Sequence, residues 1–398
     1  MKRAVFRVDA SSQIGTGHVM RCLNLARELR NKKFEILFIC RDFPGNLNGF
    51  IREQEFEICV LPAPSLSKKS EDFLACLSRG GRDDDQSVNY AEWLGVPWEQ
   101  DAEETLETFK IISESVDLLI IDHYGLDARW ERKFKNKAKK ILVIDDLANR
   151  PHDCDFLLDQ NLVISSLPLS QSQDCVGADL CVRPDKERYK NLVSSTCQCL
   201  LGPNYALLNP AVLKARKDRE QYFMSGEEFK SCLVFMGGTD PDNFSQALAL
   251  NLLKIFPTLK IYLIIGRANL NFSKLKAEFE PYKNIEILIQ PENYFNLLTQ
   301  VDFVVGGSGS STWERCCIGV PSFFFQIADN QKDICESVSQ IQAGVFLGDL
   351  KKLKTAELVG CIEKIVEFAP LDLERMAAVG KALVDGLGVM KVSEACCL

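Results

Sequence analysis

The stretch AVFRVDASSQIGTGHVMR, which runs from Ala4 to Arg21, determines how we interpret the first half of the chain. Its apolar run at 4–8 is typical of a β-strand and ends in Asp9, and small polar residues then lead to the turn Gly15-Thr16-Gly17. A helical pattern begins at His18. Strand, glycine loop and helix in this order are typical of an open α/β sheet, where ligands bind beyond the carboxyl ends of the strands. We therefore expect His18 to lie at a ligand-binding crevice.

His18 is a candidate general base. The N-terminus of a helix carries a positive partial charge, which favours a neutral imidazole that can accept a proton. The chain has only two other histidines, His123 and His152. The loop and the first turns of the helix offer three candidate substrate-binding residues, Gly15, Gly17 and Arg21. The alternative is that His18 is an ordinary polar residue of the first helical turn.

Apolar runs alternate with helical patterns along the first half of the chain. We expect strands at 4–8, 34–40, 58–61, 116–122 and 140–146, and helices at 18–31, 102–115 and 127–137. Near-continuous apolar strands separated by helices predict a parallel sheet that is covered on both faces. The polar segment 65–100 interrupts the pattern with a predicted long loop and a short helix at 86–94. This segment is either a lid or binding loop, or a solvated insertion.

Polar residues also follow the later strands. Asp122-His123-Tyr124-Gly125 ends one strand and Asp145-Asp146 ends the next, so these side chains are expected on the same rim as His18. A carboxylate within reach of an imidazole would fix its tautomer and raise its pKa, as in an oriented general base. The alternative for Asp145 and Asp146 is that they cap the next segment.

The second half repeats this architecture after a less regular region at 147–215, which we interpret as the closing strands of the first domain and a crossover. We expect strands at 231–236, 259–265, 285–290, 302–305 and 321–327, and helices at 243–255, 293–300, 311–318, 332–342, 355–368 and 372–386. A chain of 398 residues exceeds the size at which a single core stops growing, so we expect two α/β domains, at 1–212 and 213–398.

Two glycine turns follow strands of the second domain. Glycines and hydroxyls at a helix start present free backbone N–H groups, which suit a diphosphate. The candidate residues are Gly237, Gly238, Gly307, Ser308, Ser310, Ser311 and Thr312, with Glu314 placed to accept hydrogen bonds from ribose hydroxyls. The turns lack the lysine of a P-loop and the spacing of a dinucleotide fold, so neither ATP nor NAD is favoured. The alternative is a packing turn with a helix cap.

Composition narrows the class of protein. A net charge of −8 argues against a nucleic-acid or membrane partner, because either would need an excess of Lys and Arg. The chain has sixteen cysteines, and its sequence shows neither a signal peptide nor an apolar run of membrane length. We therefore expect the cysteines to be free thiols of a cytoplasmic protein. None has zinc spacing, so we expect neither a metal nor another cofactor.

Seven stretches together resemble a known family, the UDP-2,4-diacetamido-2,4,6-trideoxy-β-L-altropyranose hydrolases of pseudaminic acid biosynthesis. They are RVDASSQIGTGHVMRCLNLA (7–26), YAEWLGVPWEQDAEET (90–105), IDHYGLD (121–127), IDDLANRPHDCDFLLDQN (144–161), LLGPNYALLNP (200–210), FMGGTDPDN (235–243) and GGSGSSTWERCCIGVPSFFFQIADNQ (306–331). The region 162–199 and the aspartates at 83–85 match nothing in the family.

The resemblance implies the glycosyltransferase B (GT-B) architecture, in which two Rossmann-like domains face each other across a cleft. The N-terminal domain would carry the catalytic histidine and the C-terminal domain would bind the nucleotide sugar. By the same resemblance, His18 would be the general base and Tyr124 would face it across the cleft. Glu314 would bind the ribose, and Asn330 and Gln331 would contact the donor.

The implied reaction agrees with the residues found. UDP is a competent leaving group, so hydrolysis at the anomeric carbon needs one base to activate water and fixed donors for the departing diphosphate, without a metal. Direct displacement by that water would invert the anomeric carbon. Two alternatives stay open: a glycosyltransferase that uses a UDP-sugar donor, and a non-catalytic nucleotide-sugar-binding protein.

Overall fold

The computed structural model describes residues 2–64, 89–112, 115–164, 185–222, 228–238, 240–267 and 269–397. Its contacts divide the chain into two compact units. The first unit comprises Met1–Leu158 and Tyr189–Cys199, and the second comprises Asp159–Arg188 and Leu200–Leu398. Residues 200–212, which the sequence led us to place in the first domain, therefore group with the second unit.

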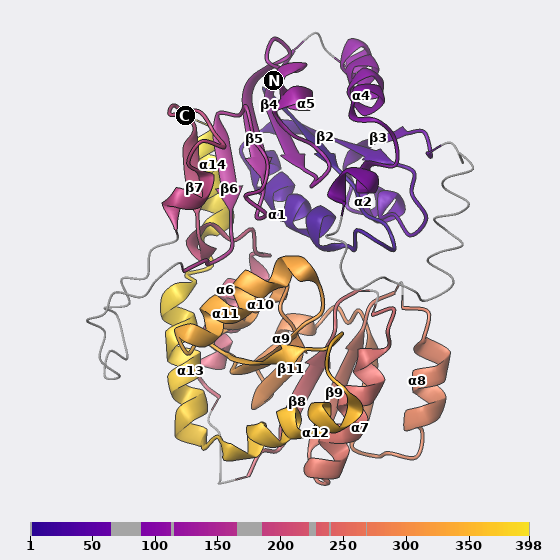
Figure 1. Ribbon diagram of the computed structural model, residues 1–398, viewed down its shortest axis with the longest axis vertical. Coiled ribbons are helices and arrows are strands. Elements are labelled where there is room, and N and C mark those ends of the chain that lie inside the picture. The colour runs from indigo at the N-terminus through magenta and orange to yellow at the C-terminus, as the bar shows by residue number, and fades with distance from the viewer. Residues whose placement is uncertain are drawn as a thin grey trace. The chain divides into compact units, whose positions relative to one another are not determined.

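A seven-stranded sheet with the order β3-β2-β1-β4-β5-β6-β7 forms the centre of the first unit (Figure 1). Its strands are β1 (Lys2–Val8), β2 (Phe34–Arg41), β3 (Glu57–Leu61), β4 (Val116–Asp122), β5 (Ala138–Ile144), β6 (Phe156–Asp159) and β7 (Gln198–Leu201). The pairings from β3 through β6 are parallel. Strand order reverses where β1 lies between β2 and β4, so a ligand-binding crevice is expected at the carboxyl ends of β1 and β4.

The helices of the first unit are α1 (Gly17–Asn31), α2 (Asn48–Glu53), α4 (Trp98–Ile112) and α5 (Ala128–Arg132), with a 3-10 helix η1 (Tyr90–Leu94). Helix α1 buries an apolar face that includes Val19, Leu23 and Ala26. Of the polar segment 65–100, residues 65–88 lie outside the described residues, and so do the aspartates at 83–85. The remaining part holds η1 and the start of α4, which begins earlier than the sequence suggested.

The second unit contains a six-stranded parallel sheet with the order β10-β9-β8-β11-β12-β13. The strands are β8 (Ser231–Phe235), β9 (Lys260–Ile265), β10 (Ile285–Ile289), β11 (Phe303–Gly307), β12 (Ser322–Gln326) and β13 (Val345–Asp349). The helices are α6 (Ala211–Arg219), α7 (Phe244–Ile255), α8 (Phe272–Phe279), α9 (Tyr294–Leu298), α10 (Ser311–Ile318), α11 (Lys332–Gln340), α12 (Thr355–Glu363), α13 (Pro370–Leu383) and α14 (Gly388–Cys397), with 3-10 turns η2 (Lys186–Tyr189), η3 (Pro203–Tyr205), η4 (Asp329–Gln331) and η5 (Lys364–Glu367) along the chain.

This second sheet is buried on both faces. Phe323 and Phe325 of β12 belong to one core cluster, with α7, α8 and α12, whereas Phe324 belongs to another, with α6, α9, α10 and α11. Successive side chains of a strand point to opposite faces, so an unbroken apolar run buries both. The predicted class of two parallel-sheet α/β domains is confirmed.

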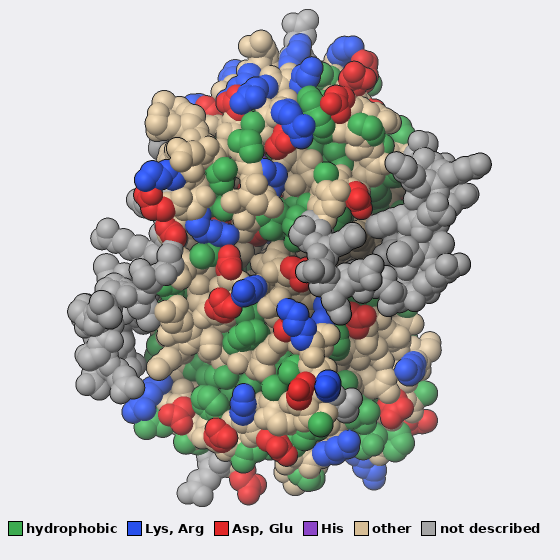
Figure 2. Space-filling view, in the orientation of Figure 1, with side chains coloured by type: hydrophobic (Ala, Val, Ile, Leu, Met, Phe, Trp, Pro, Cys, Tyr) green, Lys and Arg blue, Asp and Glu red, His purple; other side chains and the backbone are tan. Residues whose placement is uncertain are grey.

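Charged side chains of both signs share the visible face of the molecule. On the face drawn in Figure 2, Lys and Arg side chains are interspersed with Asp and Glu instead of gathering in one basic area. Within the described part of the chain, none of the helices combines the length and the apolar character needed to cross a membrane.

Candidate active site

The loop between β1 and α1 brings His18 to the carboxyl end of the first sheet. Gly15 has φ +81°, a left-handed conformation that favours glycine, and its N–H donates to the carbonyl of Ser11 at 2.9 Å. No atom lies within 4 Å of where a Cβ of Gly15 or Gly17 would be, so space beside the loop is open to a ligand. Helix α1 starts at Gly17, which places His18 in its first turn.

His18 contacts a carboxylate at the switch point of the sheet. Its Nδ1 lies 2.6 Å from Oδ1 of Asp122, the last residue of β4. Arg21 donates to both oxygens of the same carboxylate, from Nε at 2.7 Å and from Nη2 at 2.6 Å. Burial opposes ionisation of Asp122, but Arg21 and His18 outweigh it and hold the pKa of this carboxyl well below its usual range.

An ionised Asp122 determines the tautomer of His18. A carboxylate can only accept, so Nδ1 of the ring carries the proton and Nε2 keeps its lone pair. Within the described residues Nε2 has no hydrogen-bond partner, and the residue retains 9% exposure. In this geometry Nε2 can accept a proton while Asp122 holds the ring in place, which is what an oriented general base requires.

Tyr124 and Asp146 complete this cluster. Tyr124 packs its ring perpendicular to that of His18, with centroids 4.7 Å apart, and its hydroxyl donates to Asp146. Asp146 also accepts from Nη1 of Arg21 at 3.1 Å. Tyr124 therefore lies in the same unit as His18 and in direct ring contact with it. Asp146, for which the sequence left a capping role open, instead links Arg21 to Tyr124.

Two aromatic residues of η1 extend the wall beside His18. Trp93 lies 5.6 Å from Tyr124 between ring centroids and 6.5 Å from His18, and Tyr90 contacts both Trp93 and Tyr124. The indole N–H of Trp93 is inaccessible to solvent and has no acceptor among the described residues. Trp93 and Tyr90 were not among the predicted site residues, because the segment before α4 has no regular pattern that places it at the site.

The other polar residues of this rim hold the fold together. Asp9 is fully buried and forms an ion pair with Arg7 at 2.8 Å, and it accepts from the backbone N–H of Arg41. Asp145 pairs with Arg150 at 2.6 Å. Both carboxylates are thus committed to internal partners, unlike the group around His18.

In the second unit, the two glycine turns lie at the carboxyl ends of adjacent strands, β8 and β11. Gly237 has φ +90°, and no atom lies within 4 Å of where its Cβ would be. Gly238 instead packs its carbonyl against Gly266, which follows β9, so close that a Cβ on Gly266 would lie 2.0 Å from it. Gly237 therefore leaves room for a ligand, whereas Gly238 serves close packing of the backbone. Thr239 lies outside the described residues.

The turn from Gly307 to Thr312 leads into α10. Ser311 Oγ and Thr312 Oγ1 accept hydrogen bonds from Arg315, and Ser310 Oγ accepts from Gln160. Ser308 is fully buried. In the described part of the chain, the backbone N–H groups of Gly309 and Ser310 have no backbone acceptor. The donors open to an anion are therefore main-chain groups at a helix N-terminus, whereas the hydroxyls of Ser310, Ser311 and Thr312 face internal partners.

Glu314, in the first turn of α10, is partly buried, and burial raises the pKa of its carboxyl to about 7. Gln331 accepts from the backbone N–H of Ile327 at 3.0 Å, and its Nε2 would lie 3.8 Å from a Cβ on Gly309. Asn330 and Gln331 belong to η4. The structure thus brings Gln331 to the glycine turn.

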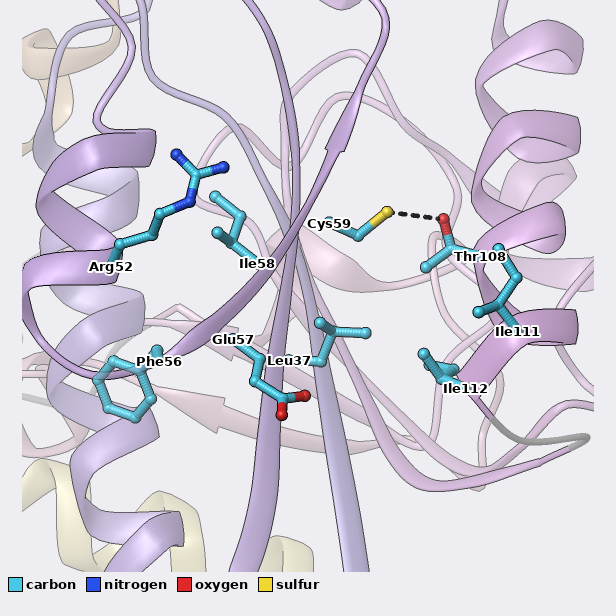
Figure 3. A pocket seen from close by; sticks show the side chains of 9 residues that line it. All are labelled: Leu37, Arg52, Phe56, Glu57, Ile58, Cys59, Thr108, Ile111 and Ile112. Atoms are coloured by element: carbon cyan, nitrogen blue, oxygen red, sulfur yellow. Dashed lines mark hydrogen bonds between the residues drawn. The ribbon is translucent and has the colours of Figure 1, made fainter.

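Two further features of the described residues bear on these sites, namely possible metal ligands and one surface pocket. The described residues contain no group of three or more His, Cys, Asp or Glu side chains able to hold a metal ion. A pocket of about 480 Å³ lies at the edge of the first sheet (Figure 3). Side chains of β2, β3, α2 and α4 and the ring of Phe56 line it, and Cys59 points toward Thr108, with 3.2 Å between Sγ and Oγ1. It includes none of the predicted site residues.

Known proteins with related sequences carry names from sugar metabolism. No protein-family model matches it. A UDP-2,4-diacetamido-2,4,6-trideoxy-beta-L-altropyranose hydrolase of Campylobacter jejuni is 27% identical over 310 residues, which cover 77% of this chain and 85% of that protein. The spore coat polysaccharide biosynthesis protein SpsG of Bacillus subtilis is 21% identical over 387 residues, or 97% of this chain and 95% of the relative. The predicted resemblance to the hydrolases is confirmed.

Solved structures share the fold. MurG of Acinetobacter baumannii matches with a TM-score of 0.59 at 12% identity and covers 99% of each chain. UGT89C1 of Arabidopsis thaliana, solved with UDP, matches with a TM-score of 0.61 at 13% identity and covers 100% of each chain. At such identities the likeness shows the fold alone, and the fold is that of the GT-B glycosyltransferases.

Proposed function

We propose that this protein is a nucleotide-sugar hydrolase that cleaves UDP-2,4-diacetamido-2,4,6-trideoxy-β-L-altropyranose to UDP and the free sugar, as part of pseudaminic acid biosynthesis. The observation that carries the proposal is the pair of His18 and Asp122 beside an open glycine loop at the switch point of the first sheet. The relative from Campylobacter jejuni, which bears this activity as its name, supports the choice of substrate.

The proposed chemistry is displacement at the anomeric carbon. A water oxygen attacks C1 while Nε2 of His18 accepts a proton from that water, and Asp122 stabilises the imidazolium that forms. The bond between C1 and the phosphate oxygen breaks, and its electron pair leaves with UDP. Attack from the face opposite UDP inverts the configuration at C1. Tyr124, Trp93 and Tyr90 offer an aromatic wall for the deoxy and acetamido groups of the sugar.

The second unit would hold the nucleotide. Backbone N–H groups at the start of α10 and the open turn at Gly237 are suited to the diphosphate, and Glu314 to the ribose. No metal takes part in the proposed reaction, since the fixed donors of the helix N-terminus can stabilise the leaving group.

The test is release of UDP from this UDP-sugar without any acceptor, in water enriched in ¹⁸O and with a chelator present. We expect UDP that carries no ¹⁸O and a free sugar of inverted configuration, because the C1–O bond is the one broken. UDP-N-acetylglucosamine, which has the same nucleotide and a different sugar, is the matched control and should be cleaved far more slowly. Label in UDP would show attack at phosphorus and contradict the mechanism.

A glycosyltransferase is the second candidate, favoured by the fold shared with MurG and UGT89C1. It would release UDP only after an acceptor is added. A binding protein without catalysis would bind UDP and release nothing in either condition. The same assay therefore distinguishes the hydrolase, the glycosyltransferase and the binding protein.

A further inference from the structure

Arg315 of α10 is a buried cation beneath the second glycine turn. The residue is 1% exposed, and its guanidinium donates to the carbonyl of Gly307 at 3.0 Å, to Oγ1 of Thr312 at 3.1 Å and to Oγ of Ser311 at 3.2 Å. All three acceptors are neutral, and all belong to the turn. Its Nε–H is buried and has no acceptor among the described residues.

The charge of this guanidinium is not balanced by the protein. Within the described residues no carboxylate lies within ion-pair distance of it, although buried charges are ordinarily paired. The adjacent Glu314 carboxyl has a pKa raised to about 7 by burial, so near neutral pH it is ionised only in part. Burial likewise lowers the pKa of Arg315. An unpaired buried cation costs stability, and such a cost is typical of a binding site that awaits its ligand.

Gly306 packs tightly against the end of β8 and lies beside the guanidinium. A Cβ on Gly306 would lie 2.5 Å from the carbonyl oxygen of Phe235 and 3.5 Å from Nη1 of Arg315. Phe235 ends β8 and Gly306 lies near the end of β11, so the cation is placed where both glycine turns begin. It therefore lies beneath both of the turns suited to phosphate groups.

We propose that Arg315 is the positioning residue that recognises the diphosphate: its uncompensated charge is neutralised by the phosphate groups of the bound nucleotide, while its hydrogen bonds hold the turn in shape. This inference rests on the proposed function and adds to it the residue whose positive charge favours binding of the phosphate groups. It predicts that the second unit selects ligands by the charge of the phosphate chain more than by the nucleoside.

The experiment compares binding of UDP and uridine by the intact chain and by Arg315→Met, with calorimetric titration. Met has a similar length and no charge. We expect UDP affinity to fall about 10- to 100-fold, the range of hydrogen bonds made to a charged group, and uridine affinity to change by less than about threefold. Equal losses for both ligands, or no loss for UDP, would overturn the inference.

Arg219 is the matched control. It is also buried in the second unit and donates to backbone carbonyls of Thr299 and Val301, which precede β11 at the opposite edge of the sheet from the glycine turns. Arg219→Met should lower the melting temperature and leave the ratio of UDP to uridine affinity unchanged. A changed ratio in this variant would mean that any buried arginine produces the effect, and would overturn the inference.

A second variant covers the case in which Arg315→Met does not fold. Arg315→Lys keeps the charge and gives up the forked hydrogen bonds, so we expect it to keep UDP affinity within about tenfold. A folded Arg315→Lys that no longer binds UDP would show that geometry, not charge, is what the residue supplies. Failure of the wild-type chain to bind UDP is a different result, because it would refute the proposed nucleotide site itself.

Discussion

His18 differs from the other two histidines in the exposure of its side chain. In His123, Nδ1 accepts the backbone N–H of Gly125 and Nε2 faces Asp9 at 3.4 Å. In His152, Nδ1 lies 2.6 Å from Glu131 and Nε2 faces Asp145 at 3.9 Å. Neither Nε2 makes a hydrogen bond, but both rings are enclosed in the interior, with side-chain exposures of 1% for His123 and 0% for His152. His18 combines a carboxylate on Nδ1 with a side chain that keeps 10% exposure, so its Nε2 is the one that a water molecule can reach.

Replacement of His18 by Asn should nearly abolish turnover and spare nucleotide binding. A general base contributes about 100- to 10,000-fold to the rate, and the amide of Asn cannot accept the proton from water. The measurement is the rate of UDP release, with a UDP titration of the same sample to show that the fold is intact. Wild-type turnover by His18→Asn would refute the assignment.

Most residues of this cluster could be predicted, because the ends of apolar strands are visible in the sequence. His18 follows a glycine turn, and Asp122 and Tyr124 end an apolar run, so all three were expected on one rim. The sequence could not predict that one carboxylate, that of Asp122, would contact both the imidazole of His18 and the guanidinium of Arg21. Arg315 escaped notice for a related reason: a sequence does not distinguish a paired arginine from an unpaired one.

At the scale of elements, strands buried on both faces were the most predictable. Strands β4 and β12 contain unbroken apolar runs at 118–121 and 323–325, and β1 has one at 4–6 before the buried Arg7, because both faces of these strands are buried. Strands β6, β7 and β13 were not delimited in advance. The first two have four residues each, and β13 contains Gly348 at an irregular pairing with β12. Helices α2, α6, α8 and α14 were not predicted either.

Helix α10 leads to a prediction about pH, through the carboxyl group of Glu314 in its first turn. Burial raises the pKa of this carboxyl from 4.5 to about 7, so the fold favours the neutral form. The unfolded chain ionises first, and the free energy of unfolding falls as pH rises from about 4.5 to about 7. Glu314→Gln should therefore be more stable than the wild type at pH 8, by at most about 3 kcal/mol, and equal to it near pH 4.

The same carboxyl should couple UDP binding to protons. Ribose hydroxyls donate to the ionised form, so binding should release protons near pH 6.5 and weaken as pH falls below about 7. Calorimetry in two buffers of different ionisation enthalpy measures the release. UDP itself titrates in this range, so the informative quantity is the difference between the wild type and Glu314→Gln. Identical proton release by both would place the ribose elsewhere.

At the scale of the whole molecule, the chain passes between the two units more than once. Residues 200–212 illustrate why their boundary is hard to read from sequence: they are irregular and contain prolines, yet Leu208 and Val212 are buried in a core cluster of the second unit. Gly388, the first residue of α14, packs against the backbone of Ala206 so closely that a Cβ there would lie 2.3 Å from its oxygen. A core contact between distant segments leaves no local pattern in the sequence.

These contacts predict how two fragments should differ. A fragment that starts at residue 213 loses Leu208 and Val212, and burial of two such side chains contributes about 3–6 kcal/mol. That amount is comparable to the total stability of a domain, which is about 5–15 kcal/mol. A fragment of residues 200–398 keeps both side chains and Ala206, against which α14 packs. We expect the longer fragment to unfold cooperatively on heating, followed by circular dichroism, and the shorter one to melt at a much lower temperature or without cooperativity.

The longer fragment also tests where the nucleotide is held. It contains both glycine turns, Glu314 and Arg315, so it should bind UDP in a calorimetric titration. It lacks His18 and Tyr124, so it should release no UDP from the UDP-sugar. If the fragment unfolds cooperatively but does not bind UDP, while the intact chain does, then the first unit provides most of the nucleotide contacts. The roles that we assign to the two units would then have to be exchanged.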